Sequence, residues 1–279
     1  MPIANVNGVR IRYELSGDGV IPLVLVHGSW GSQRVWDLAV PKLAPSFRVL
    51  TYDRRGHGDS ELVSGQGSVC DDVGDLAALI EHLGLAPTYV AGNSFGASIT
   101  LRLAAARPDL LRGIMAHEPP LLSLLADDPL LEAMLEDVHQ RNAAVVERIR
   151  SGDHAGAAEQ FCETVALGPG TWVQVPPEDQ QAWIEHAPTF LDEENDPESR
   201  AFDVGSITGF PHPTLLTLGD QSPPMFAAII QHLAPALPHA ETLTLSGTGH
   251  IPHQTHPDAY VDTITAFIRK QQERRRNAT

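Results

Sequence analysis

A pentapeptide with the sequence GNSFG, residues 92–96, constrains the fold of this chain more than any other segment. An apolar run at residues 89–91 precedes it, and a helix-like stretch at residues 97–107 follows. The order is therefore strand, sharp turn and helix, with Ser94 at the apex. Glycines let the strand and the helix approach closely, and the strain of such a turn holds the serine hydroxyl clear of the backbone. The pattern predicts a nucleophilic serine; a plain structural turn is the alternative.

Strand-like and helix-like segments alternate through the first 120 residues. Short apolar runs predict strands at residues 9–15, 22–26, 48–52, 88–91 and 111–116. Helices are expected between them, at residues 35–43, 69–83 and 97–107. Alternation of this kind is typical of a mostly parallel, doubly wound sheet that carries helices on both faces. The predicted fold class is α/β.

The pattern changes after residue 120 and returns near residue 209. Between these points the sequence predicts helices at residues 129–149, 155–166 and 177–186, an acidic loop or cap at residues 192–197, and no strand. Strands are then expected at residues 213–218 and 242–245, and helices at residues 224–233 and 257–270. We therefore expect a core made of residues 1–120 and 209–279, with residues 121–208 inserted as a helical lid.

The loops that follow the predicted strands carry most of the candidate chemistry. These loops begin at His27, Asp53, Ser94, Glu118, Asp220 and His250. In an open parallel sheet the carboxyl ends of the strands meet at one edge, and ligands bind there. The sequence therefore predicts a single site to which these loops contribute, covered by the lid.

A serine nucleophile needs a base, and the base needs an acid that orients it. The chain has 13 histidines, so position must select among them. His250 follows the last predicted strand, which is where the base stands in the chain order serine, acid, histidine. His253 and His256 are the competitors, although His256 is better placed to begin the last helix. We take His250 as the base.

An oxyanion hole needs two backbone N–H groups near the serine. The amide of Phe95 lies at the start of the helix after Ser94 and supplies the first. The amide of Ser29, in the loop after residues 22–26, is the best candidate for the second. Trp30 either forms a wall of the pocket or packs against the lid.

Together these motifs resemble the α/β-hydrolase superfamily. They are HGSWG at residues 27–31, YDRRGHGDS at residues 52–60, GNSFG at residues 92–96, and the pair Gly249-His250, and they span most of the chain. The resemblance implies the α/β-hydrolase fold. It also implies that residues 53–60 form a structural turn, so Asp53 and His57 are given no catalytic role.

The position of the acid departs from the commonest pattern of that superfamily. Many members carry an aspartate three residues after the glycine that ends the strand following the lid, and here that position is Ser222. Asp220 is shifted by two residues, and we keep it as the second candidate. Glu118 stands 24 residues after Ser94 at the end of the next strand, where certain haloalkane dehalogenases and zearalenone-type lactone hydrolases place their acid.

The sequence around Glu118 strengthens this assignment. The motif HEPP at residues 117–120 is similar to the acid motif of the lactone hydrolases, in which histidine precedes the glutamate and proline follows shortly. A carboxylate at the end of an apolar strand also needs a partner. We therefore predict Glu118 as the acid; pairing with an arginine at the lid junction is the alternative.

A serine at the apex argues against haloalkane or epoxide chemistry, in which relatives use aspartate there. The expected reaction is hydrolysis of a hydrophobic ester, lactone or thioester through an acyl-enzyme. Carbon–carbon bond hydrolysis, cofactor-free perhydrolysis and a non-catalytic ligand receptor remain alternatives on the same scaffold. Pocket-facing lid candidates are Trp172, Trp183, Phe190 and residues 121–125, with Phe190 placed where lactone hydrolases present an aromatic ring.

Composition narrows the partners. With 35 acidic and 19 basic residues the formal net charge is −16, so neither nucleic acid nor an anionic membrane is expected. No apolar run of about 18 residues predicts a membrane span, and residues 1–12 lack the apolar centre of a signal peptide. Cys70 and Cys162 show no metal-ligand spacing, which favours a reduced, cytoplasmic protein without a metal or organic cofactor. Residues 270–279 are expected to fray, and the oligomeric state is left open.

Overall fold

The computed structural model describes residues 2–277. Its centre is an eight-stranded sheet with the order β1-β2-β4-β3-β5-β6-β7-β8. The strands are β1 Ile3–Val6, β2 Val9–Ser16, β3 Pro22–Val26, β4 Arg48–Tyr52, β5 Thr88–Asn93, β6 Leu111–His117, β7 Thr214–Gly219 and β8 Ala240–Leu245. The first two strands pair antiparallel, and β3 to β8 are parallel. The sheet is thus the mostly parallel one that the sequence predicted.

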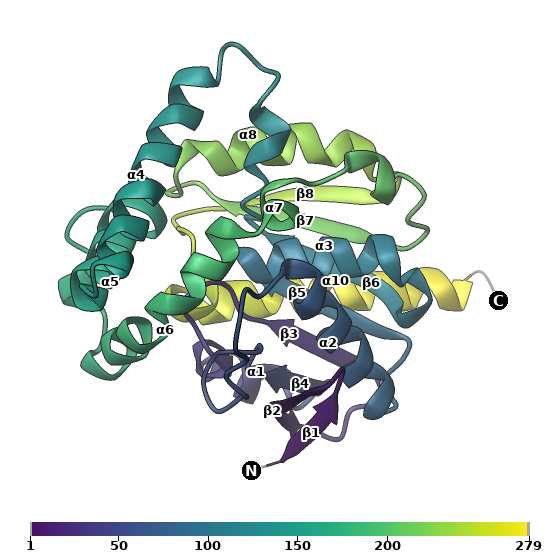
Figure 1. Ribbon diagram of the computed structural model, residues 1–279. Helices are drawn as coiled ribbons and strands as arrows, with labels where there is room; N and C mark the ends of the chain where they lie inside the picture. The colour runs from purple at the N-terminus through teal and green to yellow at the C-terminus, as the bar shows by residue number, and fades with distance from the viewer. Residues whose placement is uncertain (1, 278–279) are drawn as a thin grey trace.

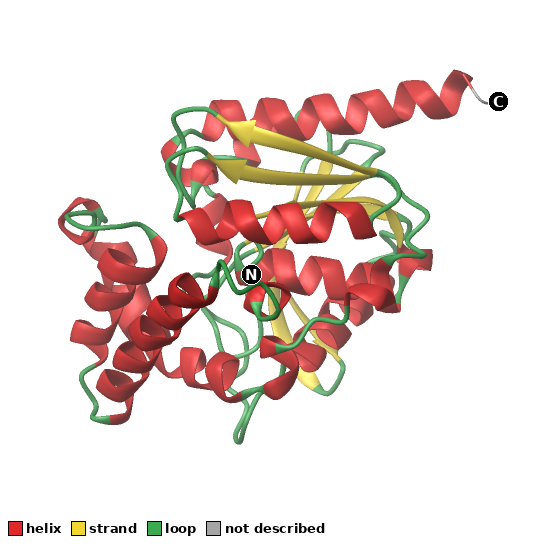
Figure 2. Ribbon diagram, turned by 90° about the horizontal axis from the view of Figure 1, so that it is seen from above, coloured by secondary structure: helices red, strands yellow, loops and turns green. Residues whose placement is uncertain are grey.

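Helices cover both faces of this sheet and produce three layers (Figure 2). One face carries α2 (Val69–His82), α3 (Phe95–Ala106) and α8 (Pro224–Leu233), and the other carries the short α1 (Val40–Leu43), α9 (Pro252–Thr255) and the long α10 (Pro257–Asn277). Successive side chains of β3 point to opposite faces. Val24 and Val26 pack with the first group of helices, and Leu23 and Leu25 pack on the α10 side. This burial on both faces explains why the strand is a continuous apolar run.

Residues 121–208 lie between β6 and β7 and contain helices and turns but no strand. Their helices are α4 (Glu132–Arg150), α5 (His154–Phe161), α6 (Pro177–Asn195) and α7 (Pro197–Arg200). This part, called the helical segment below, stands to one side of the sheet (Figures 1 and 2). It has its own apolar cluster, in which Val145, Ile149, Ala187 and Phe190 surround Trp30 of the core. The cluster anchors the segment beside the loop that follows β3.

Several element boundaries differ from the sequence predictions. β1 was not predicted, and the helix expected at residues 35–43 is a 3-10 turn, Gln33–Trp36, followed by the single turn α1. Helix α6 continues through Pro188 to Asn195, so most of the expected acidic loop is helical and only Asp196 acts as a cap, for α7.

The ends of the chain and the lengths of the helices complete the comparison. Helix α10 extends to Asn277 instead of fraying from residue 270, and residues 278–279 lie outside the described part. Within residues 2–277, the helices are all too short or too polar to cross a lipid bilayer.

Candidate active site

Ser94 stands at the apex of a strained turn between β5 and α3. Its φ of 55° and ψ of −123° lie in a region that non-glycine residues rarely occupy. The flanking glycines are required by space: a Cβ on Gly92 would lie 2.2 Å from the oxygen of Gly96, and a Cβ on Gly96 would lie 2.3 Å from the oxygen of Val26. The turn therefore exists only because β5, α3 and β3 approach at glycines. A backbone strain of this kind is typical of functional sites.

Glu118 and His250 meet beside this turn. Glu118 follows β6, has φ of 48°, and is fully buried. Its Oε2 lies 2.6 Å from His250 Nδ1, and its Oε1 accepts a hydrogen bond of 2.7 Å from the Gly219 amide. Burial alone would raise the pKa of Glu118, but the hydrogen bond and charge of His250 outweigh it and lower that pKa to about 2. The carboxylate is thus ionised and fixes the proton of His250 on Nδ1, leaving Nε2 as an acceptor.

Neighbouring side chains hold His250 in place. The Asn93 side chain donates a 2.8 Å hydrogen bond to the carbonyl of His250, and the Phe226 ring stacks on the imidazole with centroids 4.6 Å apart. His117 is fully buried beside Glu118, and burial lowers the pKa of His117 to about 4. His117 is therefore neutral, and the short hydrogen bond of Glu118 is the one with His250.

Ser94 and His250 open into one cavity of about 550 Å³, a size suited to a small organic ligand. Its floor includes Ser29 and Phe95, and α4, α5 and α6 of the helical segment supply much of its wall. The apolar part is formed by Leu122, Leu135, Val138, Phe161, Val165, Phe190, Met225 and Phe226. Neither lysine nor arginine is among the described residues that line it, whereas Glu193 and Glu194 are.

The two predicted oxyanion donors lie on the cavity floor. Phe95 is the first residue of α3, and amides of the first helical turn have no partner within the helix. Ser29 follows Gly28, whose Cα approaches the Ser94 side chain so closely that an added Cβ would lie 3.0 Å from Ser94 Cβ. The side chain of His250 forms a hydrogen bond with Glu118, and both His250 and Ser94 line the cavity.

Other residues singled out in the sequence have structural contacts. Asp220 binds Ser246 and the Gly247 amide on an exposed loop, whereas Glu118 contacts His250. His253 is buried against Trp36 and is not among the residues that line the cavity. His256 precedes α10, as expected. Asp53 accepts hydrogen bonds from the amides of Gln33 and Asp59, which agrees with a structural turn.

The aromatic candidates separate into two groups. Phe190 lines the cavity, and Trp183 lines an adjacent groove of about 630 Å³ that also reaches His250. Trp30 has no exposed surface and stacks with Phe161, so it packs against the helical segment and does not form a wall of the cavity. Trp172 packs against the same apolar cluster.

Two charged residues at the site were not singled out from the sequence. Arg54 and Glu193 are both buried and form a 3.0 Å ion pair beneath the cavity. Arg54 lies in the motif assigned to a structural turn, and Glu193 lies in the stretch predicted as an acidic loop. The sequence signal that could have identified Glu193 is its position on the same helix face as the buried Ala187 and Phe190. Among residues 2–277, no group of three or more His, Cys, Asp or Glu side chains is arranged to hold a metal ion.

Several known proteins are similar to this chain. The model of the alpha/beta hydrolase family matches residues 23–263. A dihydrolipoyllysine-residue acetyltransferase component of an acetoin cleaving system from Pseudomonas putida is 28% identical over 295 residues, covering 96% of this chain and 69% of the relative. A solved α/β hydrolase from Sphaerobacter thermophilus has a TM-score of 0.78 at 27% identity, covering 96% of this chain and 100% of that one. A thermophilic esterase from Thermogutta terrifontis has a TM-score of 0.77 at 22% identity, with 97% and 98% covered.

Proposed function

Because the chain belongs to the α/β hydrolase family, we propose that it hydrolyses an uncharged, hydrophobic carboxylic ester or lactone through an acyl-enzyme. In this proposal Ser94 is the nucleophile, His250 the base and Glu118 the acid that orients the base. The observation that carries the proposal is the 2.6 Å contact between Glu118 and His250 at the cavity that Ser94 enters. The helical segment serves as the lid.

The reaction follows from the positions of these groups. Ser94 Oγ attacks the acyl carbon while His250 Nε2 takes its proton, and Glu118 stabilises the imidazolium that forms. The Ser29 and Phe95 amides donate hydrogen bonds to the oxygen that becomes negative. The leaving alcohol takes the proton from His250 and departs, leaving acyl-Ser94. Water activated by His250 then attacks the acyl carbon, releases the carboxylic acid and restores Ser94.

The cavity lining supports a neutral, apolar substrate. Its walls are mostly aliphatic and aromatic, and the charged side chains among its described lining residues are carboxylates. A substrate carboxylate in this space would lose its hydration without gaining a cationic partner. The names of the similar esterase and of the acetyltransferase relative both refer to acyl-group chemistry, which agrees with the proposal.

The test is hydrolysis of p-nitrophenyl esters of increasing acyl length and of γ- and δ-lactones with apolar substituents. Wild type is compared with Ser94→Ala and with Ser98→Ala, a buried serine one turn further along α3 that lies outside the cavity lining. We expect turnover by wild type and Ser98→Ala and a loss of turnover in Ser94→Ala. Intact-mass analysis after treatment with an aryl phosphonate should show one adduct, absent from Ser94→Ala.

Each alternative has its own outcome in this experiment. Turnover that survives in Ser94→Ala would refute the assignment of the nucleophile. Phosphonylation of Ser94 without hydrolysis of any ester or lactone would refute the substrate class and favour carbon–carbon cleavage, which is assayed with a coloured dienol ketone. Absence of both phosphonylation and turnover would favour a receptor. A preference for dicarboxylate monoesters over neutral esters would refute the inference from the cavity lining.

A further inference from the structure

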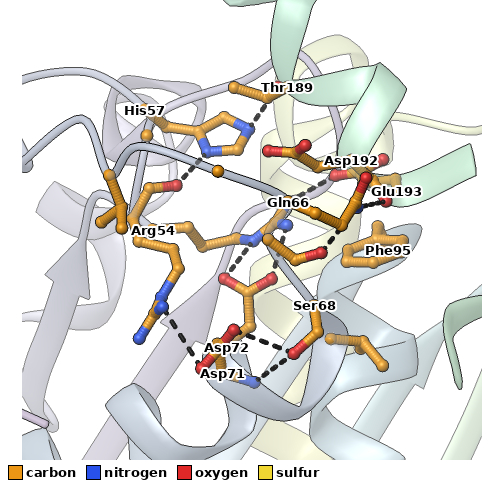
Figure 3. Close-up of a pocket in the computed structure, with 16 residues that line it drawn as sticks. Arg54, His57, Gln66, Ser68, Asp71, Asp72, Phe95, Thr189, Asp192 and Glu193 are labelled. Carbon is orange, nitrogen blue, oxygen red and sulfur yellow. Dashed lines mark hydrogen bonds and ion pairs between the residues drawn. The ribbon is translucent and has the colours of Figure 1, made fainter. Parts of the chain in front are cut away.

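A second, smaller pocket of about 120 Å³ shares Phe95 and Glu193 with the lining of the catalytic cavity, and Figure 3 shows its lining residues. Arg54, from the loop after β4, is one of the residues that line this pocket. The guanidinium lies 4.6 Å from the centroid of the Phe95 ring and forms ion pairs with Asp72 of α2 at 2.8 Å and Glu193 of α6 at 3.0 Å. One buried cation thus contacts the residue that carries one proposed oxyanion amide.

The same cation contacts the peptide group that carries the other proposed amide. Arg54 Nη1 lies 3.3 Å from the carbonyl oxygen of Gly28, and that carbonyl belongs to the same planar peptide group as the Ser29 N–H. His27 Nε2 accepts a hydrogen bond from the Arg54 amide, so the His27 proton is on Nδ1, which donates to the Gly28 oxygen at 2.8 Å. Because the peptide group is planar, two donors that hold the Gly28 oxygen also fix the direction of the Ser29 N–H.

Helix α6 holds the same loop from the side of the helical segment. Glu193 Oε2 accepts a 2.5 Å hydrogen bond from the Ser29 hydroxyl. Seven residues earlier, His186 accepts from the Gly58 amide through Nε2, so its Nδ1 carries the proton and donates to the Trp30 carbonyl at 3.0 Å. Residues seven apart lie on one face of a helix. One face of α6 is therefore bound to two successive residues of the loop.

Stability is a weak reason for this arrangement. Burying three charged groups costs desolvation energy that their attraction often does not recover, and apolar replacements are frequently as stable. Burial raises the pKa of Glu193 to about 7, even though Arg54 and Ser29 favour its charged form; Asp72, the other charged group facing it, opposes that form. A carboxylate kept at such a cost in contact with a proposed oxyanion residue is better explained by a role in positioning.

We infer that Arg54 and Glu193 are positioning residues that orient the Gly28–Ser29 peptide as an oxyanion donor and join it to helix α6. The inference rests on the proposed function. Arg54 acts through the Gly28 carbonyl, and Glu193 acts through the Ser29 hydroxyl and through Arg54. Neither touches the reacting atoms. Their effect is on the rate of acyl transfer, not on the affinity for the ground-state ester.

The test uses Glu193→Gln, Ser29→Ala and the double variant, with p-nitrophenyl butyrate as the substrate. Removal of an oxyanion donor lowers kcat by about 10²- to 10³-fold, and misorientation of a retained donor should lower it by about tenfold or more at a nearly unchanged KM. Ser29→Ala removes the donor of the hydrogen bond between Ser29 and Glu193, and Glu193→Gln removes the charge of its acceptor. Since both substitutions act on the same interaction, the double variant should be no slower than the slower single variant. The rate of Ser94 phosphonylation should fall in parallel.

Asp75→Asn is the matched control. Asp75 is a buried carboxylate of α2 that pairs with Arg55, the neighbour of Arg54, at 2.7 Å, and neither residue of that pair lines the catalytic cavity. Asp75→Asn removes a buried charge from the same region without a contact to the Gly28–Ser29 peptide. The kcat of this variant should therefore stay at the wild-type level. Thermal unfolding of all variants checks that they are folded.

The outcomes separate this inference from the proposed function. If wild type hydrolyses the ester, three results would overturn the inference and leave the proposed function intact. They are an unchanged kcat in Glu193→Gln, a change in Glu193→Gln that is confined to KM, and losses of the two single variants that multiply in the double variant. If wild type is phosphonylated but hydrolyses no ester, the proposed function fails. The inference is then tested by comparing the rates of Ser94 phosphonylation in wild type and the variants, and equal rates would overturn it. Absence of both reactions would overturn both.

Discussion

Glu118→Gln is the substitution whose effect the structure predicts most closely. The two carboxylate oxygens of Glu118 have different partners: Oε1 accepts from the Gly219 amide at 2.7 Å, and Oε2 faces His250 Nδ1 at 2.6 Å. Glutamine has one oxygen and one NH₂ group. Because the Gly219 N–H requires an acceptor, the oxygen must take the Oε1 position, and the NH₂ group then faces His250. A flipped amide would instead place its NH₂ group against the Gly219 N–H, and two buried donors facing each other cost about 1–3 kcal/mol.

The NH₂ group reverses the tautomer of His250. With a donor facing it, Nδ1 must act as the acceptor, so the proton moves to Nε2, where it blocks removal of the Ser94 proton. Loss of the correct tautomer in a serine triad lowers kcat by about 10⁴-fold, which corresponds to about 5 kcal/mol in the activation free energy. We expect a loss of about 10³- to 10⁴-fold for Glu118→Gln in the p-nitrophenyl butyrate assay, with KM little changed.

Asp220→Asn is the control for this prediction. Asp220 is exposed and bound to Ser246 and Gly247, away from His250, so its loss should leave kcat close to that of wild type. A severe loss in Asp220→Asn together with a loss below about tenfold in Glu118→Gln would refute the assignment of the acid, because tautomer control is worth far more than that.

Four further predictions concern stability and substrate size. The pKa of Glu193 is raised, so the stability linked to its proton is present below its unfolded pKa and is lost as the pH rises through about 7. In urea unfolding, the free energy of unfolding of Glu193→Gln relative to wild type should therefore be higher at pH 8 than at pH 5. The pKa of Glu118 is lowered to about 2, so the contribution of its ionised carboxylate to stability is lost as the pH falls below about 4.5. The difference in free energy of unfolding between wild type and Glu118→Gln should therefore become smaller from pH 6 to pH 3. Gly96→Ala places a Cβ 2.3 Å from a backbone oxygen and should lower Tm sharply, whereas Gly209→Ala meets no atom within 4 Å and should not; similar Tm values would refute the close packing at the turn. Val138→Trp should fill part of the cavity wall on α4 and lower kcat/KM for octanoate esters far more than for acetate esters; equal losses would show that the acyl chain binds elsewhere.

The core of the fold was predictable because its signals are local. β3 and β4 are apolar runs buried on both faces, and their observed bounds equal the predicted ones. The turn at Ser94 was identifiable because its two glycines are forced by contacts within a few residues and with one neighbouring strand. Glu118 could be proposed because a carboxylate at the end of an apolar strand needs a partner, and the structure supplies His250, 132 residues later.

The helical segment was less predictable because distant contacts decide its details. Proline at residue 188 favoured an end to α6, yet the helix continues because Ala187 and Phe190 on either side of it are buried in the cluster around Trp30. The importance of Glu193 depends on Ser29, 164 residues away, and on Arg54, 139 residues away. A local sequence pattern does not predict contacts between residues so far apart in the chain. A run of acidic residues is more often a solvated loop, which is why residues 192–197 were predicted as one.

The geometry also explains how the proposed acid, Glu118, can follow β6 while most of the superfamily pattern is kept. β6 and β7 are neighbours in the sheet, and the Glu118 amide donates to the carbonyl of Thr217 at 3.1 Å. Ser222, at the position where an aspartate is commonest, lies close enough to the Glu118 carboxylate to favour its charged form. Carboxylates from either strand end can therefore reach the same side of His250. The left-handed backbone of Glu118, with φ of 48°, turns its side chain toward that place, and the Gly219 amide becomes its second partner. In the proposed triad the acid is thus defined by the space next to Nδ1 of His250 and not by a fixed distance along the chain.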